Sequence, residues 1–203
     1  MKKNKISKDW INKQKKDIYV RRSKIEGYRS RAVYKLEEIE KKFKIFRNGI
    51  SVIDLGAAPG GWSQYLSKNI KNAKILSIDL MEMEKIKNTF QIKGDFTESD
   101  SKKQIKDYFG GRVDIVLSDM AANTTGNKNM DSLVTGELCM EAMDFAKEIL
   151  KIDGKFVSKI FMGSLFNDIL LKAKKNFKKV NIYKPPASRK NSKESFIICK
   201  FLR

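Results

Sequence analysis

The stretch Asp54-Leu-Gly-Ala-Ala-Pro-Gly-Gly-Trp62 decides the fold of this 203-residue chain. Its first residues end the short apolar run 51–55, which predicts a buried strand, and residues 63–69 after it have the spacing of a helix. In a doubly wound α/β sheet, the first strand-to-helix turn is rich in glycine because the ligand approaches its backbone there. The stretch therefore predicts a ligand-binding turn, with Gly56 and Gly60 among its contacts.

The spacing of the glycines excludes two common classes of nucleotide-binding protein. A phosphate-binding loop would continue into Gly-Lys-Ser or Gly-Lys-Thr, which this turn lacks. A dinucleotide-dependent oxidoreductase would show the spacing G-x-G-x-x-G, and Gly-Ala-Ala-Pro-Gly-Gly does not. A nucleoside cofactor of another kind is the remaining interpretation.

Apolar runs alternate with amphipathic segments along the rest of the chain, which predicts an α/β fold with a mainly parallel sheet. The last two strands have no helix between them, so we expect them to pair antiparallel at one edge of the sheet. Residues 1–28 form a basic arm that we expect to be flexible or loosely helical, and 29–203 form one domain. We predict strands at 51–55, 74–80, 90–93, 113–118, 155–161, 180–184 and 195–202, and helices at 30–43, 63–69, 105–109, 133–150 and 165–177.

Four consecutive predicted strands end in or are followed by an acidic residue: Asp54, Asp79, Asp95 and Asp119. A single acid at such a place is usually a cap or turn residue. Four in a row predict the rim of one site at the carboxyl edge of the sheet. Asp79 stands where an acid binds the ribose hydroxyls of an adenine nucleoside, and Asp95 is placed to accept a hydrogen bond from the adenine amino group.

Acid–base chemistry in this chain falls to Lys, Asp, Glu, Tyr or Cys, because the sequence has no histidine. Lys159 lies inside the apolar run 156–161, where a lysine is unfavourable unless it is paired or used. The alternative is a lysine at the sheet edge whose ammonium group reaches solvent. Lys35, Asp119 and Glu194 are predicted to converge with it, although Lys35 and Glu194 taken singly would be interpreted as surface charges.

The positive charge lies at the two ends of the chain. Residues 1–50 have 17 lysines and arginines against 6 acids, 51–150 have 12 against 15, and 151–203 have 14 against 3. This pattern favours a nucleic-acid partner over mere solubility, and arginine in particular grips phosphate with a planar fork. The alternative is a lysine-rich composition. The predicted RNA contacts are Arg21, Arg22, Arg29, Arg31 and Arg189.

Other features of the sequence bear on the cellular compartment and on membrane or metal binding. No apolar run approaches the length of a membrane span, and the basic N-terminus is not followed by the apolar run of a signal peptide. Cys139 and Cys199 fit no metal or redox spacing, so we expect buried thiols in a reducing cytosol. We therefore expect a cytoplasmic monomer without a metal site or a membrane partner.

Six segments within 29–198 resemble one known family: RSRAVYKLEEI, VIDLGAAPGGWSQYL, GDF, LSDMAAN, FVSKIFMG and SRKNSKESFI. Their combination is similar to the FtsJ/RrmJ family of ribosomal RNA 2′-O-ribose methyltransferases. The resemblance implies a Rossmann-like class I fold that uses S-adenosylmethionine, with a seven-stranded, mostly parallel sheet whose last strand is antiparallel. It implies a uridine in the A-loop of 23S rRNA, within the assembled large subunit, as the substrate. One departure is Ala122, where the family usually has proline, which is expected to loosen the loop 123–129.

The resemblance also implies roles for individual residues. Its Lys-Asp-Lys-Glu tetrad falls on Lys35, Asp119, Lys159 and Glu194, with Lys159 as the candidate proton acceptor. If Lys159 instead keeps its proton, it would stabilise the developing alkoxide. The implied cofactor contacts are Gly60, Trp62, Asp79, Asp95 and Asp119.

Two further interpretations stay open. The first is the same chemistry on another RNA, such as a tRNA anticodon loop or an mRNA cap. The second is a non-catalytic ribosome-assembly factor that uses the fold to bind RNA. A binding module has no need of Lys159 in a strand, so the intact tetrad argues against the second.

Overall fold

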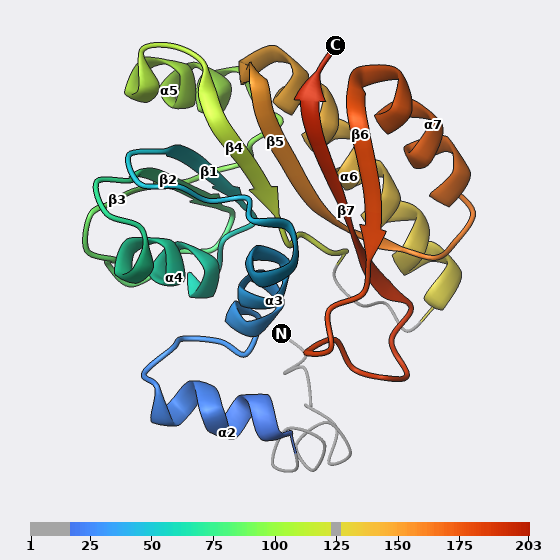
Figure 1. Cartoon of the computed structure of the whole chain (residues 1–203), viewed down its shortest axis with the longest axis horizontal. Helices are drawn as coiled ribbons and strands as arrows, with labels where there is room; N and C mark the ends of the chain where they lie inside the picture. The colour runs from blue at the N-terminus through green and yellow to red at the C-terminus, as the bar shows by residue number, and fades with distance from the viewer. Residues whose placement is uncertain (1–16, 123–126) are drawn as a thin grey trace, which may run out of the picture.

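The computed structural model describes residues 17–122 and 127–203, and within them a seven-stranded sheet has the order β3-β2-β1-β4-β5-β7-β6. Helices cover both faces of this sheet (Figure 1). The strands are β1 (Ser51–Leu55), β2 (Lys74–Asp79), β3 (Thr89–Lys93), β4 (Val113–Ser118), β5 (Leu150–Phe161), β6 (Phe177–Tyr183) and β7 (Glu194–Leu202).

The pairing of the strands confirms the predicted mixed sheet. Strands β1 to β5 are parallel to one another, whereas β7 is antiparallel to both β5 and β6. The last two strands do form an antiparallel unit at one edge, with β6 outermost and β7 inserted beside β5. This insertion places the first residue of β7 next to the last residue of β5, Glu194 opposite Phe161.

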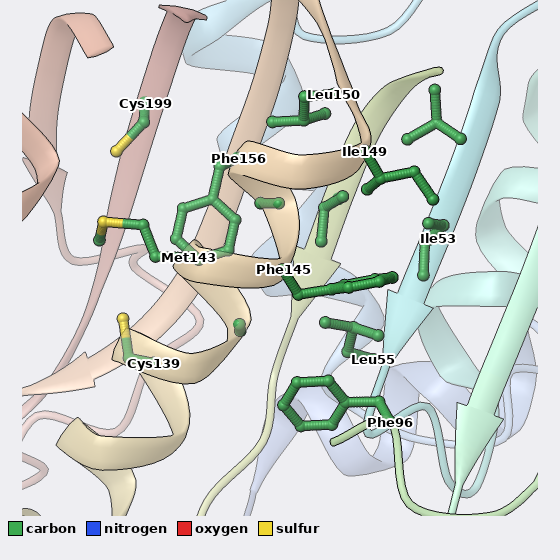
Figure 2. Close-up of a cluster of buried hydrophobic side chains, with 14 of the residues drawn as sticks. Ile53, Leu55, Phe96, Cys139, Met143, Phe145, Ile149, Leu150, Phe156 and Cys199 are labelled. Atoms are coloured by element: carbon green, nitrogen blue, oxygen red, sulfur yellow. The ribbon is translucent and has the colours of Figure 1, made fainter. Parts of the chain in front are cut away.

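Two apolar cores lie on the two faces of the sheet. One is formed with α5, α6 and α7, and Figure 2 shows Phe145 and Ile149 of α6 packed near Ile53, Leu55 and Phe156 of the strands. The other is formed with α3 and α4. Strands buried on both faces are typical of parallel sheets, and explain why the strand segments read as continuous apolar runs. The helices are α2 (Ile18–Ile25), α3 (Val33–Phe43), α4 (Gly61–Asn69), α5 (Ser99–Phe109), α6 (Lys128–Ile149) and α7 (Phe166–Asn176).

Several predicted boundaries were wrong. Helix α5 begins at Ser99 rather than at 105. The apolar pattern did not reveal this start, because the first turns are polar and only Ser101 and Ile105 of the helix are buried. Helix α6 begins at Lys128 rather than 133, where the side chain of Asn127 accepts hydrogen bonds from the N–H groups of the first turn. Helix α6 ends at Ile149, next to its predicted end at 150, but β5 begins at Leu150 rather than at 155, because Leu150 already pairs with Val113 of β4.

Part of the basic arm is an ordered helix that packs on the domain. The Asp17 side chain caps α2 by accepting a hydrogen bond from the Tyr19 N–H. The Tyr19 and Tyr34 rings are 5.4 Å apart, and the guanidinium of Arg22 lies 4.3 Å from the centre of the Tyr34 ring. Helix α2 is thus joined to α3, while residues 1–16 of the predicted arm lie outside the described part of the chain.

Candidate active site

The glycine turn after β1 has backbone geometry that only glycine adopts easily. Gly56 has φ 68° and Gly60 has φ 99°. A Cβ atom at Gly56 would collide with the Met120 side chain, and one at Gly60 would lie 2.6 Å from Cδ1 of Ile86. The turn leads directly into α4, and the first N–H groups of a helix have no partner within it.

The predicted cofactor acids Asp79 and Asp95 hold turns at the carboxyl edge of the sheet. The two carboxylate oxygens of Asp79 accept hydrogen bonds from Ala58 N–H at 2.9 Å and Met81 N–H at 2.8 Å. Oδ1 of Asp95 accepts hydrogen bonds from the N–H and hydroxyl of Thr97. Each carboxylate oxygen has two lone pairs, so these contacts fix the acids and leave them able to accept from a ligand.

Asp54 does not lie on the rim, and this part of the sequence prediction was wrong. Its side chain is 1% exposed and accepts a hydrogen bond from the Ser63 hydroxyl at 2.6 Å. That hydroxyl is also 2.5 Å from the Ser77 hydroxyl. Burial raises the pKa of Asp54 to about 7, although the hydrogen bond from Ser63 opposes the shift.

Trp62 contributes its ring to the core instead of to an open pocket. The side chain is 3% exposed, its Nε1–H donates a hydrogen bond to the Ala32 carbonyl at 2.8 Å, and its ring lies 5.8 Å from that of Phe196. These contacts fix α4 against α3 and β7. The buried ring leaves the backbone N–H, in the first turn of α4, as the group of Trp62 that could contact a cofactor.

The structure brings the four predicted charged residues into one chain of ion pairs at the carboxyl edge of the sheet. Lys159 Nζ lies 2.9 Å from Asp119 Oδ1 and also donates to the Asp119 carbonyl. Lys35 Nζ lies 3.7 Å from Asp119 Oδ2 and 2.8 Å from Glu194 Oε2. All four side chains are 16% exposed or less.

The electrostatics of this chain keep its inner members charged. Burial acts to raise the pKa of Asp119, but Lys159 and Lys35 outweigh it and hold that pKa below its ordinary value. Burial likewise acts to lower the pKa of Lys35, but Asp119 and Glu194 outweigh it and raise that pKa. A cation and an anion therefore face each other at the centre of the site at neutral pH.

Two of the five arginines predicted to bind RNA donate hydrogen bonds from their guanidinium groups to backbone carbonyls of the protein. Arg29 donates from its guanidinium to the carbonyls of Glu84 at 2.7 Å and Lys85 at 2.9 Å. Arg31 donates to the Ala187 carbonyl at 2.5 Å, and its side chain is 16% exposed. The other three are more exposed: Arg21, Arg22 and Arg189.

Sequence reasoning missed the residues that support the tetrad. Ser188 Oγ donates a hydrogen bond to Glu194 Oε1 at 2.8 Å. Glu38 Oε2 accepts a hydrogen bond from Ala187 N–H at 2.7 Å, and Glu38 Oε1 accepts one from the Tyr19 hydroxyl at 3.3 Å. The only signal in the sequence was the position of Ser188 just ahead of Glu194, and it does not reveal a contact.

The remaining sequence predictions have mixed outcomes. Cys139 and Cys199 are buried and free, as expected, and burial raises the pKa of Cys139 to about 11. Ala122 N–H donates to Thr135 Oγ1 at 3.1 Å, a bond that proline could not make, so Ala122 itself is held. Residues 123–126 of the adjoining loop lie outside the described residues. Over 17–122 and 127–203 there is neither a helix able to span a membrane nor a cluster of three or more potential metal ligands.

The strand order, the antiparallel β7 and the glycine turn together define a Rossmann-like methyltransferase fold. A family model for FtsJ-like methyltransferases matches residues 28–202, and the chain belongs to that family. It is 64% identical, over the whole of both chains, to the ribosomal RNA large subunit methyltransferase E of Pelagibacter ubique.

Solved structures agree with the family assignment. A ribosomal RNA methyltransferase from Plasmodium falciparum is 32% identical with a TM-score of 0.77, covering 86% of this chain and 98% of that one. Human methyltransferase-like protein 13, solved with S-adenosylhomocysteine, has a TM-score of 0.59 at 12% identity, covering 81% of this chain and 82% of that one. The second likeness concerns the fold alone.

Proposed function

We propose that this protein transfers the methyl group of S-adenosylmethionine to the 2′-oxygen of a ribose in the RNA of the large ribosomal subunit. The observation that carries the proposal is the buried ion-pair chain Lys159–Asp119–Lys35–Glu194, next to the glycine turn at the carboxyl edge of the sheet. The curated relative at 64% identity is named for methylation of large-subunit ribosomal RNA, which supports the substrate class.

The residues around the turn fit S-adenosylmethionine. The backbone of Gly56, Gly60 and Trp62 would approach the cofactor where a side chain at either glycine would collide with its neighbours. Asp79 and Asp95 are fixed by backbone N–H groups, which suits carboxylates that receive ribose hydroxyls and an adenine amino group. When bound, the cofactor supplies an activated methyl group on a sulfonium, whose sulfur is a good leaving group.

The protein must remove one proton and position one ribose. Lys159 is the proposed acceptor of the 2′-hydroxyl proton once its ammonium group has lost a proton to solvent, because the carboxylate and the carbonyl of Asp119 both fix its position. Asp119 orients Lys159, and Lys35 positions the ribose from the opposite side of that carboxylate. Glu194 holds Lys35 at 2.8 Å. Much of the rate enhancement then comes from holding the ribose in line with the methyl group.

We further propose that the target is a uridine in the A-loop of 23S rRNA within the assembled subunit. The basic ends of the chain would bind the phosphates around a target nucleotide that is unpaired and turned outward. Arg21 and Lys24 on α2 are exposed for this contact. We expect the protein to act as a monomer.

The test is methyl transfer to defined particles. Purified protein and radiolabelled S-adenosylmethionine are incubated with large subunits from a strain that lacks the homologous gene, and 2′-O-methylation is mapped across the RNA. We expect one modified ribose in 23S rRNA and none in small subunits or tRNA. Modification of tRNA or capped mRNA would replace the proposed substrate, and cofactor binding without transfer to any RNA would indicate a non-catalytic assembly factor.

A further inference from the structure

The loop between β6 and β7 reaches the ion-pair chain through one serine. Ser188 Oγ donates a hydrogen bond to Glu194 Oε1 at 2.8 Å, while Glu194 Oε2 accepts one from Lys35 Nζ at 2.8 Å. Ser188 is 5% exposed, so water competes little for its hydroxyl. One carboxylate oxygen of Glu194 is therefore held by the loop, and the other is directed at Lys35.

The position of Ser188 is itself fixed by the preceding residue. Ala187 N–H donates to Glu38 Oε2 at 2.7 Å, and the Ala187 carbonyl accepts from Arg31 at 2.5 Å. Ala187 is 1% exposed and packs with residues of α3. Arg31 in turn lies 3.0 Å from Asp17 at the start of α2. The loop is thus attached at Ala187 to α3, the helix that carries Lys35, and to Arg31 just before it.

We propose that Ser188 is a positioning residue, which acts through Glu194 to hold Lys35 in place for methyl transfer. The effect of Ser188 on the rate of methyl transfer rests on the proposed function. Its structural effect, the ordering of the Lys35 ammonium group, does not. Arg31 belongs to the same support, which explains why an arginine that the sequence assigns to RNA is only 16% exposed.

A neighbouring serine provides a matched control. Ser192 lies in the same loop, and its Oγ accepts a hydrogen bond from the Glu194 backbone N–H at 3.1 Å. Ser192 therefore supports the backbone at Glu194 without touching the carboxylate. If Ser188 merely stabilised the loop, Ser188→Ala and Ser192→Ala would have similar effects on the site.

The first experiment measures the Lys35 ammonium group directly by ¹H–¹⁵N NMR of lysine side chains, with its signal assigned from Lys35→Gln. We expect Ser188→Ala to shift or broaden this signal, Ser188→Thr to restore it, and Ser192→Ala to leave it in place. An unchanged Lys35 signal in Ser188→Ala, or an equal change in both alanine variants, would overturn the proposal. If Ser188→Ala does not fold, Ser188→Cys, a weaker donor of similar size, is judged by the same criteria.

The second experiment measures kinetics on large subunits. We expect Ser188→Ala to lower the single-turnover rate about 10-fold while KM for subunits and the cofactor Kd change less than twofold. In a Glu194→Gln background the Ser188→Ala change should have no further effect. A raised KM with normal kcat, or effects that add in the double variant, would contradict positioning through Glu194. A wild-type protein without activity would refute the proposed function, and the NMR result would still decide the role of Ser188.

Discussion

The ammonium group of Lys35 and the carboxylate of Glu194 lie 2.8 Å apart, although 159 residues separate them along the chain. Lys35 comes from the basic N-terminal end and Glu194 from the basic C-terminal end. Their contact means that the site is complete only when the β6–β7 unit is docked beside β5. The same docking brings the loop between β6 and β7, with Arg189, to the carboxyl edge, where a polyanionic substrate would have to bind.

Removing the Lys159 amine should abolish methyl transfer and spare the cofactor. For Lys159→Ala we expect a rate at least about 100-fold lower, in line with the loss of a general base, and a cofactor Kd within about threefold of wild type. Single-turnover transfer and calorimetry measure the two quantities. Lys155→Ala is the control, because Lys155 is in the same strand but donates a hydrogen bond to the Ile45 carbonyl. Near-normal turnover in Lys159→Ala would refute the assignment of Lys159 as the proton acceptor.

A pair of arginine variants should separate RNA binding from support of the glycine turn. Arg21 is exposed, so Arg21→Gln should weaken subunit binding and reduce the slope of log affinity against log salt by about 1. Arg29 donates to the Glu84 and Lys85 carbonyls, so Arg29→Gln should lower the free energy of unfolding instead. Filter binding over a salt series and urea denaturation distinguish them, and equal salt slopes for both variants would contradict the division.

The sheet could be predicted from the sequence because buried parallel strands read as apolar runs, and the glycine turn marked which edge binds the ligand. The convergence of Lys35, Asp119, Lys159 and Glu194 was predicted from their places in the expected helices and strands, and the family resemblance supplied their roles. The antiparallel unit at the sheet edge was predicted because the sequence has no helical segment between the last two strands.

What could not be predicted depends on contacts between distant segments. Whether an arginine faces solvent or a backbone carbonyl is decided by tertiary packing, so Arg29 and Arg31 looked like Arg21 in the sequence. The pattern placed Asp54 at the end of a strand but did not reveal that α4 covers it. The contact of Ser188 with Glu194 could not be inferred, because it depends on the attachment of Ala187 to Glu38 of α3.

Asp114 lies away from the candidate active site, and its carboxylate should stabilise the fold. Ser51 N–H, Lys151 and Arg47 donate to its carboxylate at 2.9 to 3.0 Å. Burial opposes them, yet these bonds hold the pKa of Asp114 well below its ordinary value, so its contribution is present above about pH 4 and is lost as pH falls. We expect Asp114→Asn to lower the free energy of unfolding by about 2 kcal/mol at pH 7.

The control for Asp114 is a second carboxylate in the same region. Asp153 is exposed, so Asp153→Asn should change the free energy of unfolding by less than about 0.5 kcal/mol. Urea denaturation at pH 7 and at about pH 3, below the ordinary pKa of aspartate, measures both variants. The difference in unfolding free energy between Asp114→Asn and wild type should narrow at the lower pH. A difference that widens there would show that the Asp114 carboxylate is not the source of the stabilisation.

Asp54 should have the opposite dependence on pH, because its folded pKa is raised to about 7 whereas that of Asp114 is lowered. A raised carboxyl pKa stabilises the fold while the group is protonated, and this contribution is lost as pH rises from about 4 to about 7. Asp54→Asn keeps an acceptor for the Ser63 hydroxyl and removes the titration. Between pH 5 and pH 8, wild type should lose about 2–3 kcal/mol of unfolding free energy relative to Asp54→Asn.

Urea denaturation of wild type and Asp54→Asn across this range measures the difference, with the exposed Asp107→Asn as a control for surface charge. Parallel stability curves for wild type and Asp54→Asn would mean that Asp54 is ionised in the fold even at pH 5.

Bound S-adenosylmethionine is cationic at its sulfonium and would favour the ionised form of a carboxyl beneath the glycine turn. We therefore expect cofactor binding near pH 6.5 to release protons from wild type and fewer from Asp54→Asn, which calorimetry in buffers of different ionisation enthalpy measures.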